Sequence, residues 1–111
     1  DMIISAGYNI AGPEVEEALL GHPDVVEAAV IGAPDQDRGM VVQAYVVLRG
    51  GDAAGPAKVA ELQDFTKAAI APYKYPRVIE FVSELPKTIS GKTQRYRLRQ
   101  MAGAKLQARS G

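Results

Sequence analysis

The apolar run inside "RGMVVQAYVVLRG", residues 38–50, most constrains what this chain can fold into. Its valines and tyrosine are strong β-formers, and almost no polar residue interrupts them. A strand with one face in water would alternate apolar and polar residues, whereas a near-continuous apolar run is typical of a covered sheet. We therefore predict a strand over 38–50 in a sheet on which other elements pack.

Three further segments predict strands. "DVVEAAVIGAPD", residues 24–35, indicates a mostly buried strand that pairs antiparallel with 38–50. "YPRVIEFVS", residues 75–83, supplies a third strand with Ile79 and Phe81 on one face and Val78 and Val82 on the other. Near the start, the β-type runs 2–5 and 8–10 flank Ala6 and Gly7, which predicts a small hairpin.

Three segments predict helices, and together with the strands they indicate an α+β domain. Gly12 and Pro13 open the first, which Gly21 and Pro23 end. The second covers 57–71 with an apolar face of Val59, Leu62, Phe65, Ala69 and Ile70, and the basic third covers 94–109 with Leu98, Ala102 and Leu106 at four-residue spacing. We expect about three core strands plus a two-stranded N-terminal hairpin, packed with about three helices.

Composition limits the classes of function. The chain has 111 residues and no cysteine, which fits one domain and excludes disulfides, thiolate metal sites and thiol nucleophiles. No apolar run approaches the roughly 20 residues of a membrane-spanning helix, so we expect no membrane association and a cytoplasmic setting. The chain starts at Asp1 without a signal peptide, and we expect a piece of a longer polypeptide, although a cloning choice or a processed start would look the same.

Charge is divided unevenly along the chain. Residues 1–64 hold eleven acids and three bases, a net charge of −8, and residues 65–111 hold ten bases and two acids, a net charge of +8. From Pro86 onward there are seven bases and no acid. Clustered positive charge attracts phosphates and carboxylates, so the C-terminal segment indicates either an anionic partner or a solvated basic tail.

Most acids and the single histidine are expected to serve structure. The spacing of Glu14, Glu16, Glu17, Asp35 and Asp37 fits no metal-binding loop, so we expect them on solvated helix and turn surfaces. His22 is the only histidine, and its place at a helix end indicates a partner for the negative end of the helix dipole. No metal site is expected in this chain.

The segment "LPKTISGKTQR", residues 85–95, contains the most chemically distinctive lysine. Its "GKT" resembles the end of a phosphate-binding P-loop, but Pro86 stands where that loop needs a glycine, and proline has no N–H to offer a phosphate. Gly91 nevertheless gives the loop a flexible pivot, and Lys92 can carry an ammonium away from the domain body. The pattern therefore predicts a lysine loop over 86–93 that presents a mobile point charge.

Five stretches, in this order, carry a resemblance to a known family. They are G-Y-N-I followed by P-E-V-E, then H-P-x-V, P-D-x-x-R-G, A-P-Y-K-x-P and L-P-K-T-x-S-G-K-x-x-R. At these spacings the chain resembles the C-terminal domain of an AMP-forming acyl-CoA synthetase of the adenylate-forming superfamily. The segments "SAGYNIAGPEVEEALL" and "ELQDFTKAAIAPYKYPRVIEF" are most similar to the aryl-CoA ligase branch, such as benzoate- or 2-aminobenzoate-CoA ligases.

The resemblance implies an activity that this domain shares with a larger partner domain. Such enzymes join a carboxylic acid to ATP, with Mg²⁺, and then transfer the acyl group from the acyl-adenylate to coenzyme A. Lys92 matches the lysine that enters the active site for the first step. The enzyme's own N-terminal domain supplies the substrate pocket, so this domain alone is expected to bind no cofactor and to be inactive.

The resemblance also implies domain alternation and a second binding face. After rotation about a hinge near Asp1, the hairpin would meet coenzyme A, with Gly7 and neighbouring Ala6 lining the pantetheine tunnel. Lys67 and Lys74 match basic positions near the nucleotide phosphates of coenzyme A, with a solvated helix face and loop as the alternative for these two residues. Many relatives carry arginine where this chain has Asn9, so no phosphate role is assigned to Asn9.

Two other interpretations differ in the partner they require. The same domain occurs in adenylation domains that load a carrier protein, in which protein-bound pantetheine replaces coenzyme A. The basic half could instead bind nucleic acid, but Tyr96 is nearly the only stacking aromatic in the tail and no binding motif is present. We expect no nucleic-acid partner.

Overall fold

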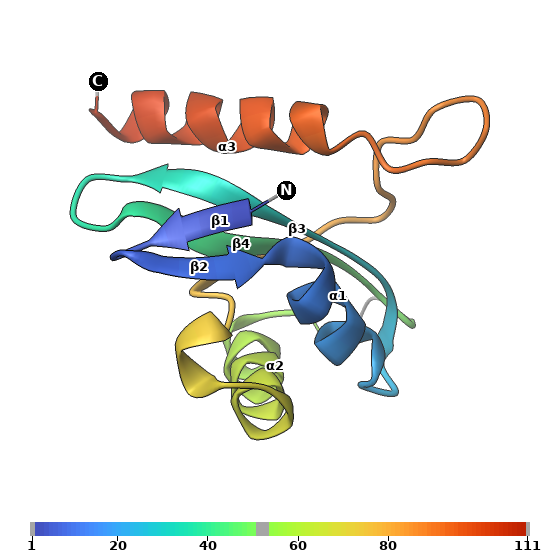
Figure 1. Cartoon of the computed structure of the whole chain (residues 1–111). Coiled ribbons are helices and arrows are strands. Elements are labelled where there is room, and N and C mark those ends of the chain that lie inside the picture. The colour runs from blue at the N-terminus through green and yellow to red at the C-terminus, as the bar shows by residue number, and fades with distance from the viewer. Residues whose placement is uncertain (1, 51–53, 111) are drawn as a thin grey trace.

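Figure 1 shows a computed structural model of the chain, which describes residues 2–50 and 54–110, with side chains described through residue 104. In chain order the elements are β1 (Met2–Ser5), β2 (Tyr8–Ala11), α1 (Gly12–Leu20), β3 (Val25–Asp35), β4 (Gly39–Leu48), α2 (Pro56–Ala69), the 3-10 helix η1 (Pro72–Lys74), β5 (Val78–Phe81) and α3 (Arg95–Ser110). Asp1, the expected neighbour of the hinge, lies outside the described residues, as does the side chain of Leu106.

The core sheet has the strand order β3-β4-β5. β3 and β4 are antiparallel, with Ala29 opposite Tyr45, and a turn joins them in which the Asp35 carboxylate accepts the Arg38 N–H at 2.9 Å. β5 lies parallel to β4, with Glu80 opposite Tyr45. The connection through α2 makes this possible, because it returns the chain to the end of the sheet at which β4 begins. β4 is therefore the central strand, as its apolar run predicts.

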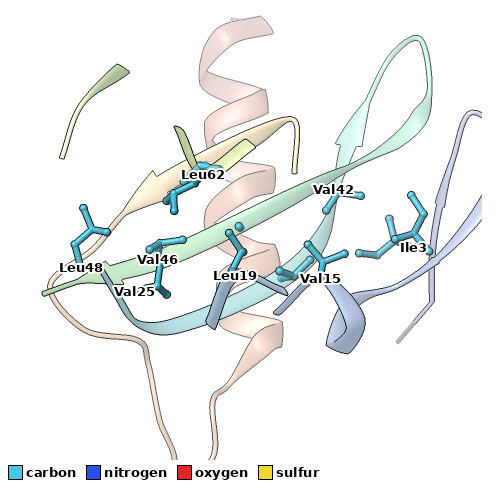
Figure 2. Close-up of a cluster of buried hydrophobic side chains, with 12 residues drawn as sticks. Ile3, Val15, Leu19, Val25, Val42, Val46, Leu48 and Leu62 are labelled. Atoms are coloured by element: carbon cyan, nitrogen blue, oxygen red, sulfur yellow. The ribbon is translucent and has the colours of Figure 1, made fainter. Parts of the chain in front are cut away.

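One face of the sheet packs against α1, α2 and the hairpin. Its buried side chains come from the sheet and from all of these elements, and Figure 2 shows how they gather around β4: Ile3, Val15, Leu19, Val25, Val42, Val46, Leu48 and Leu62. Val15, Leu19 and Leu62 have no exposed surface. Burial of an aliphatic side chain stabilises the folded state by about 1.5 to 3 kcal/mol relative to its exposure. This face holds the larger of the two buried clusters and is therefore the main apolar core.

The other face of the sheet is covered by α3, which crosses it on the side opposite α1 and α2 (Figure 1). The buried cluster here comprises Ala29, Ile31, Ala33, Val41, Tyr45, Leu85, Leu98 and Ala102. Tyr45 is completely buried, and its hydroxyl donates to the carbonyl of Leu98 at 3.4 Å. Burial on both faces explains why β4 has so few polar residues.

The hairpin β1–β2 turns at Ala6 and Gly7, whose φ angles of +50° and +85° are those of a type I′ turn. It is tied to the β3–β4 turn, because the Ala6 N–H donates to the Arg38 carbonyl at 3.0 Å. A Cβ on Gly32 would lie 3.3 Å from the Ile3 side chain and 2.9 Å from the Met40 sulfur, so a larger residue there would have to push these side chains aside where β1 packs on β3. The hairpin is thus a fixed part of the domain.

The observed architecture confirms the predicted α+β fold, with a three-stranded sheet, a hairpin and three helices. The buried face of α2 differs from the prediction: Ala69 is exposed, whereas Thr66 is fully buried and donates to the Leu62 carbonyl at 2.8 Å. A threonine can replace an apolar residue there because its own helix satisfies its hydroxyl. Within the described residues, no helix is long and apolar enough to cross a membrane.

Candidate functional site

The segment that carries Lys92 is a small hairpin-like loop built around Thr88. Lys87 and Thr93 form an isolated antiparallel bridge, and the Gln94 N–H donates to the Pro86 carbonyl at 2.8 Å. Thr88 donates its N–H to the Lys92 carbonyl at 2.8 Å, and its Oγ1 accepts the Lys92 N–H at 3.2 Å. The backbone of Lys92 is therefore held on both of its polar groups by one residue.

The tip of the loop faces outward. Gly91 has a φ of +90°, a conformation that favours glycine, and both Gly91 and Lys92 are exposed. Ile89 is fully exposed, at 109% of its reference area. In Figure 1 the loop, drawn in orange before α3, extends beyond the body of the domain. An ammonium and an isoleucine presented in this way are suited to enter a cleft in another body.

Two ion pairs hold the base of the loop to the domain body. On one side, Lys87 Nζ lies 2.5 Å from Glu27 Oε1 on β3. On the other, Arg95, the first residue of α3, binds Glu16 of α1 through Nε at 3.1 Å and through Nη2 at 2.7 Å. Glu16 is only 12% exposed and also accepts the Val30 N–H at 2.9 Å. The expectation that Glu16 faces solvent is wrong, because a distant arginine and a strand amide bind its carboxylate.

The hairpin turn with Ala6 and Gly7 lies at the opposite end of the molecule from the lysine loop (Figure 1). Both residues are exposed, and a Cβ on Gly7 would meet no atom within 4 Å. Next to the turn, the ring of Tyr8 packs against that of Tyr73 in η1, with centroids 4.7 Å apart. This contact places the hairpin turn beside η1, the segment that also carries Lys74.

The two lysines expected near a phosphate differ in their surroundings. Lys67 is exposed at the end of α2, and its Nζ lies 4.3 Å from the centroid of the Tyr75 ring. Arg77 stacks on the same ring at 4.9 Å. Lys74 is 19% exposed and binds Glu14 Oε1 at 2.7 Å, and this hydrogen bond raises the pKa of Lys74. The structure thus shows an aromatic and basic patch in which the exposed Lys67 and Arg77 flank the half-buried Tyr75, with Lys74 nearby in an ion pair.

His22 directly follows the end of α1 and takes part in a hydrogen-bonded network of charged side chains. Its Nδ1 accepts the Asp24 N–H at 3.0 Å, and its Nε2 lies 2.6 Å from the Glu61 carboxylate. The Lys58 ammonium binds both carboxylates, at 2.7 Å from Asp24 and 3.0 Å from Glu61. These hydrogen bonds lower the pKa of Asp24 and Glu61 and raise that of Lys58. His22, Asp24 and Glu61 lie close enough together to be potential ligands of a metal ion. The ammonium of Lys58 already neutralises the charge of the two carboxylates.

A groove of about 630 Å³ lies beside the start of α3. It is lined by Glu84, Leu85, Pro86, Tyr96, Arg97, Gln100, Met101 and Ala104. None of the residues assigned a site from the sequence lies in this groove. It includes Pro86 at the base of the lysine loop but not Lys92.

Comparison with known proteins identifies the origin of this arrangement. The family model of the AMP-binding enzyme C-terminal domain matches residues 14–92, which include Lys92 and all three strands of the core sheet. The chain belongs to this family. The chain spans less than a fifth of the length of curated relatives that it matches.

Three relatives illustrate the likeness. The human mitochondrial acyl-coenzyme A synthetase ACSM4 is 57% identical over 101 residues, which cover 89% of this chain and 17% of that protein. An acyl-CoA synthetase from Brucella canis superposes with a TM-score of 0.89 at 48% identity, covering 92% of this chain and 19% of that one. The anthranilate CoA ligase AuaEII, solved with anthranoyl-AMP, gives a TM-score of 0.87 at 42% identity, covering 96% and 20%.

Sequence reasoning did not find the residues that support Lys92. Thr88, Glu16 and Arg95 all lie inside the quoted motifs, but the sequence places Glu16 on a solvated surface and indicates no partner for Arg95. The segment from Pro86 onward holds no acid, so a carboxylate that binds Arg95 has to come from an earlier part of the chain. Which carboxylate that is depends on the tertiary fold.

Proposed function

We propose that this domain is the lid of an ATP-dependent, AMP-forming carboxylic acid:CoA ligase, and that Lys92 is its catalytic residue for acyl-adenylate formation. The observation that carries the proposal is the anchored loop that presents Lys92 at its exposed tip. The family assignment supports it, because the matched relatives are named as acyl-CoA synthetases. The proposed partner is the large domain of the same enzyme, which supplies the cleft that the loop enters.

The chemistry requires a cation at this point. In the first step a carboxylate oxygen attacks the α-phosphorus of ATP, and pyrophosphate leaves with the electrons of the broken P–O bond. Both reactants are anionic, so a preorganised ammonium that touches both stabilises the transition state more than the ground state. Lys92 presents such a charge. ATP with Mg²⁺ is the substrate of this step, and this chain's residues hold the lysine rather than the metal.

The second step is proposed to use the opposite end of the domain. The lysine loop and the hairpin turn lie at opposite ends of the molecule, so a single cleft does not receive both at once (Figure 1). Rotation of the domain between the steps would withdraw Lys92 and bring Ala6 and Gly7 to the thiol acceptor. The missing side chain of Gly7 leaves open space there for the pantetheine arm.

Coenzyme A is the proposed acceptor because a basic patch lies on the hairpin side of the domain. Lys67 and Arg77 flank Tyr75, and Lys74 lies beside Tyr73, which contacts Tyr8 of the hairpin. Cations next to an aromatic ring suit the nucleotide end of coenzyme A, which carries phosphates and an adenine. The second candidate acceptor is a carrier protein with attached pantetheine. Turnover of the complete enzyme with each acceptor separates the two, and activity only with the carrier protein would exclude free coenzyme A.

The proposed acid is an aryl acid such as benzoate or 2-aminobenzoate. The support is the similarity to the aryl-CoA ligase branch and to AuaEII, whose structure contains anthranoyl-AMP. A panel of aryl and alkyl acids in the complete ligase tests this choice, and a preference for alkyl acids would overturn it. We place the enzyme in the cytoplasm. The alternative is the mitochondrion, because the name of the human relative ACSM4 gives that location. Cell fractionation distinguishes the two.

The decisive experiment substitutes Lys92→Ala in the complete ligase and follows the two steps separately. ATP–pyrophosphate exchange should fall roughly a hundred- to a thousandfold, the loss typical of one preorganised charge contact worth about 3 to 4 kcal/mol. Thioester formation from supplied acyl-adenylate should survive. Arg97→Ala removes an exposed cation from the same basic segment and should leave both steps intact. Equal loss of both steps in Lys92→Ala would contradict the proposed role.

A further inference from the structure

The lysine loop has two connections to the domain body, and one of them is unusually well built. Glu16 receives three side-chain hydrogen bonds from Arg95, between 2.7 and 3.1 Å, and a fourth from the Val30 N–H at 2.9 Å. A carboxylate that is 12% exposed and bound from two directions has little freedom to move. It joins α1, β3 and α3 at the point where α3 begins.

Arg95 and Lys92 are connected through a short and ordered stretch. Only two residues separate them, and the Gln94 N–H in this stretch donates to the Pro86 carbonyl at 2.8 Å. Thr88 then fixes the backbone of Lys92 from the other arm of the loop. A shift of Arg95 would therefore move the arm that carries Lys92.

The connection on the other arm is weaker. Lys87 and Glu27 are 38% and 32% exposed, and a single ammonium–carboxylate contact joins them. Exposed pairs of this kind stabilise little, whereas a bidentate arginine–carboxylate pair also fixes direction. Of the two connections, the Glu16–Arg95 pair is thus the one able to set the position of the loop.

We propose that Glu16 is a positioning residue for Lys92, acting through Arg95. This inference rests on the proposed function of Lys92 and adds a residue on another helix, remote in sequence, to the machinery of the adenylation step. The physical reason is that a displacement of about 1 Å in a reacting geometry can cost about a hundredfold in rate. Glu16 contacts no substrate in this scheme, so its effect should be confined to what Lys92 does.

The test compares Glu16→Gln with Lys92→Ala in the complete ligase. Glutamine retains the shape of Glu16 and an acceptor for the Val30 N–H, but it loses the charge that holds Arg95. We expect adenylate formation to fall about ten- to a hundredfold, with thioester formation from supplied acyl-adenylate unchanged. In the Lys92→Ala background the same change should cost nothing further, because the residue on which it acts is gone. Arg95→Gln should reproduce the loss and be non-additive with Glu16→Gln.

Two controls separate positioning from general stability. Glu61→Gln removes a carboxylate that also joins distant segments but does not touch the loop, so it should lower the melting temperature while adenylate formation stays within twofold. Hydrogen exchange of the 111-residue chain with Glu16→Gln should increase at the amides of Thr88, Gly91 and Lys92, and stay unchanged in β4. If Glu16→Gln alone does not fold, the double variant Glu16→Gln with Arg95→Gln is used in its place, because it leaves neither charge unpaired.

The outcomes distinguish this inference from the function on which it rests. Normal adenylation by Glu16→Gln, together with a large loss in Lys92→Ala, would overturn the positioning role alone. If Glu16→Gln lowers the rate of adenylate formation by the same factor with Lys92 and with Lys92→Ala, Glu16 has only a structural role. The same conclusion follows if Glu16→Gln slows adenylate formation and thioester formation equally. Intact adenylation in Lys92→Ala would overturn the proposed function and this inference with it.

Discussion

The Nζ of Lys74 lies 2.7 Å from Oε1 of Glu14, so one of the two lysines assigned to a phosphate is already bound to a carboxylate of α1. A phosphate would have to displace Glu14 to reach it. Lys67 has no such competitor among its described contacts, since it lies over the Tyr75 ring in an exposed position. The two lysines should therefore contribute differently to binding of coenzyme A.

Substitution of Lys67 should weaken the binding of coenzyme A, whereas substitution of Glu14 should strengthen it. Lys67→Met should raise the KM for coenzyme A up to about fivefold, since an exposed ion pair is worth at most about 1 kcal/mol. Glu14→Gln releases Lys74 and should lower that KM. Steady-state kinetics with coenzyme A and dephospho-coenzyme A measure both effects. An unchanged KM in Lys67→Met would remove this residue from the binding site.

A side chain at Gly7 should block only the thiol-transfer step. Gly7→Leu places a leucine at a φ of +85°, where a non-glycine residue costs about 1 to 2 kcal/mol in stability. Gly50→Leu is the matched control, because Gly50 has a φ of +82° and equally open surroundings away from the hairpin. Both variants should lose similar thermal stability, measured by melting. Only Gly7→Leu should abolish thioester formation, and parallel loss in both would contradict a tunnel at the hairpin.

The network of Lys58, Asp24 and Glu61 should make stability dependent on pH outside the neutral range. The pKa values of Asp24 and Glu61 are lowered on folding, so their contribution is present above their unfolded pKa values, near 3.8 and 4.5, and is lost as the pH falls through the folded values. The pKa of Lys58 is raised, so its contribution persists below about 10.5 and is lost above it. Lys58→Met should lower the melting temperature between those limits, with a difference that narrows at acidic pH. A constant difference down to pH 2 would contradict this account.

The contact between α3 and the sheet should account for a large part of the stability. Leu98 is fully buried beside Tyr45, so Leu98→Ala should lower the free energy of unfolding by about 2 to 5 kcal/mol, the usual cost of a core cavity. Gln100→Ala, on the exposed side of the same helix, should change it by less than about 0.5 kcal/mol. Urea unfolding of the chain measures both values. Equal effects would mean that α3 is not packed as described.

The sequence by itself determined the kind and order of the elements and the place of the lysine loop. The apolar run of β4, the proline at the start of α1 and the Ala6–Gly7 turn act on neighbouring residues, so local spacing suffices to predict them. The family and the position of Lys92 also follow from contiguous motifs. The spacing of Ile79 and Phe81 likewise assigned the two faces of β5 correctly.

Only the tertiary structure decided which charges meet. Glu16 and Arg95 are 79 residues apart, Glu14 and Lys74 are 60 apart, and His22 lies 39 residues from Glu61. From the sequence alone, a charged residue on a helix is expected to face solvent. Its partner depends on the order of the strands in the sheet and on which helix faces pack near each other. α1 lies on one face of the sheet and α3 on the other, and the pairing of Glu16 with Arg95 near the lysine loop appears only when both are in place.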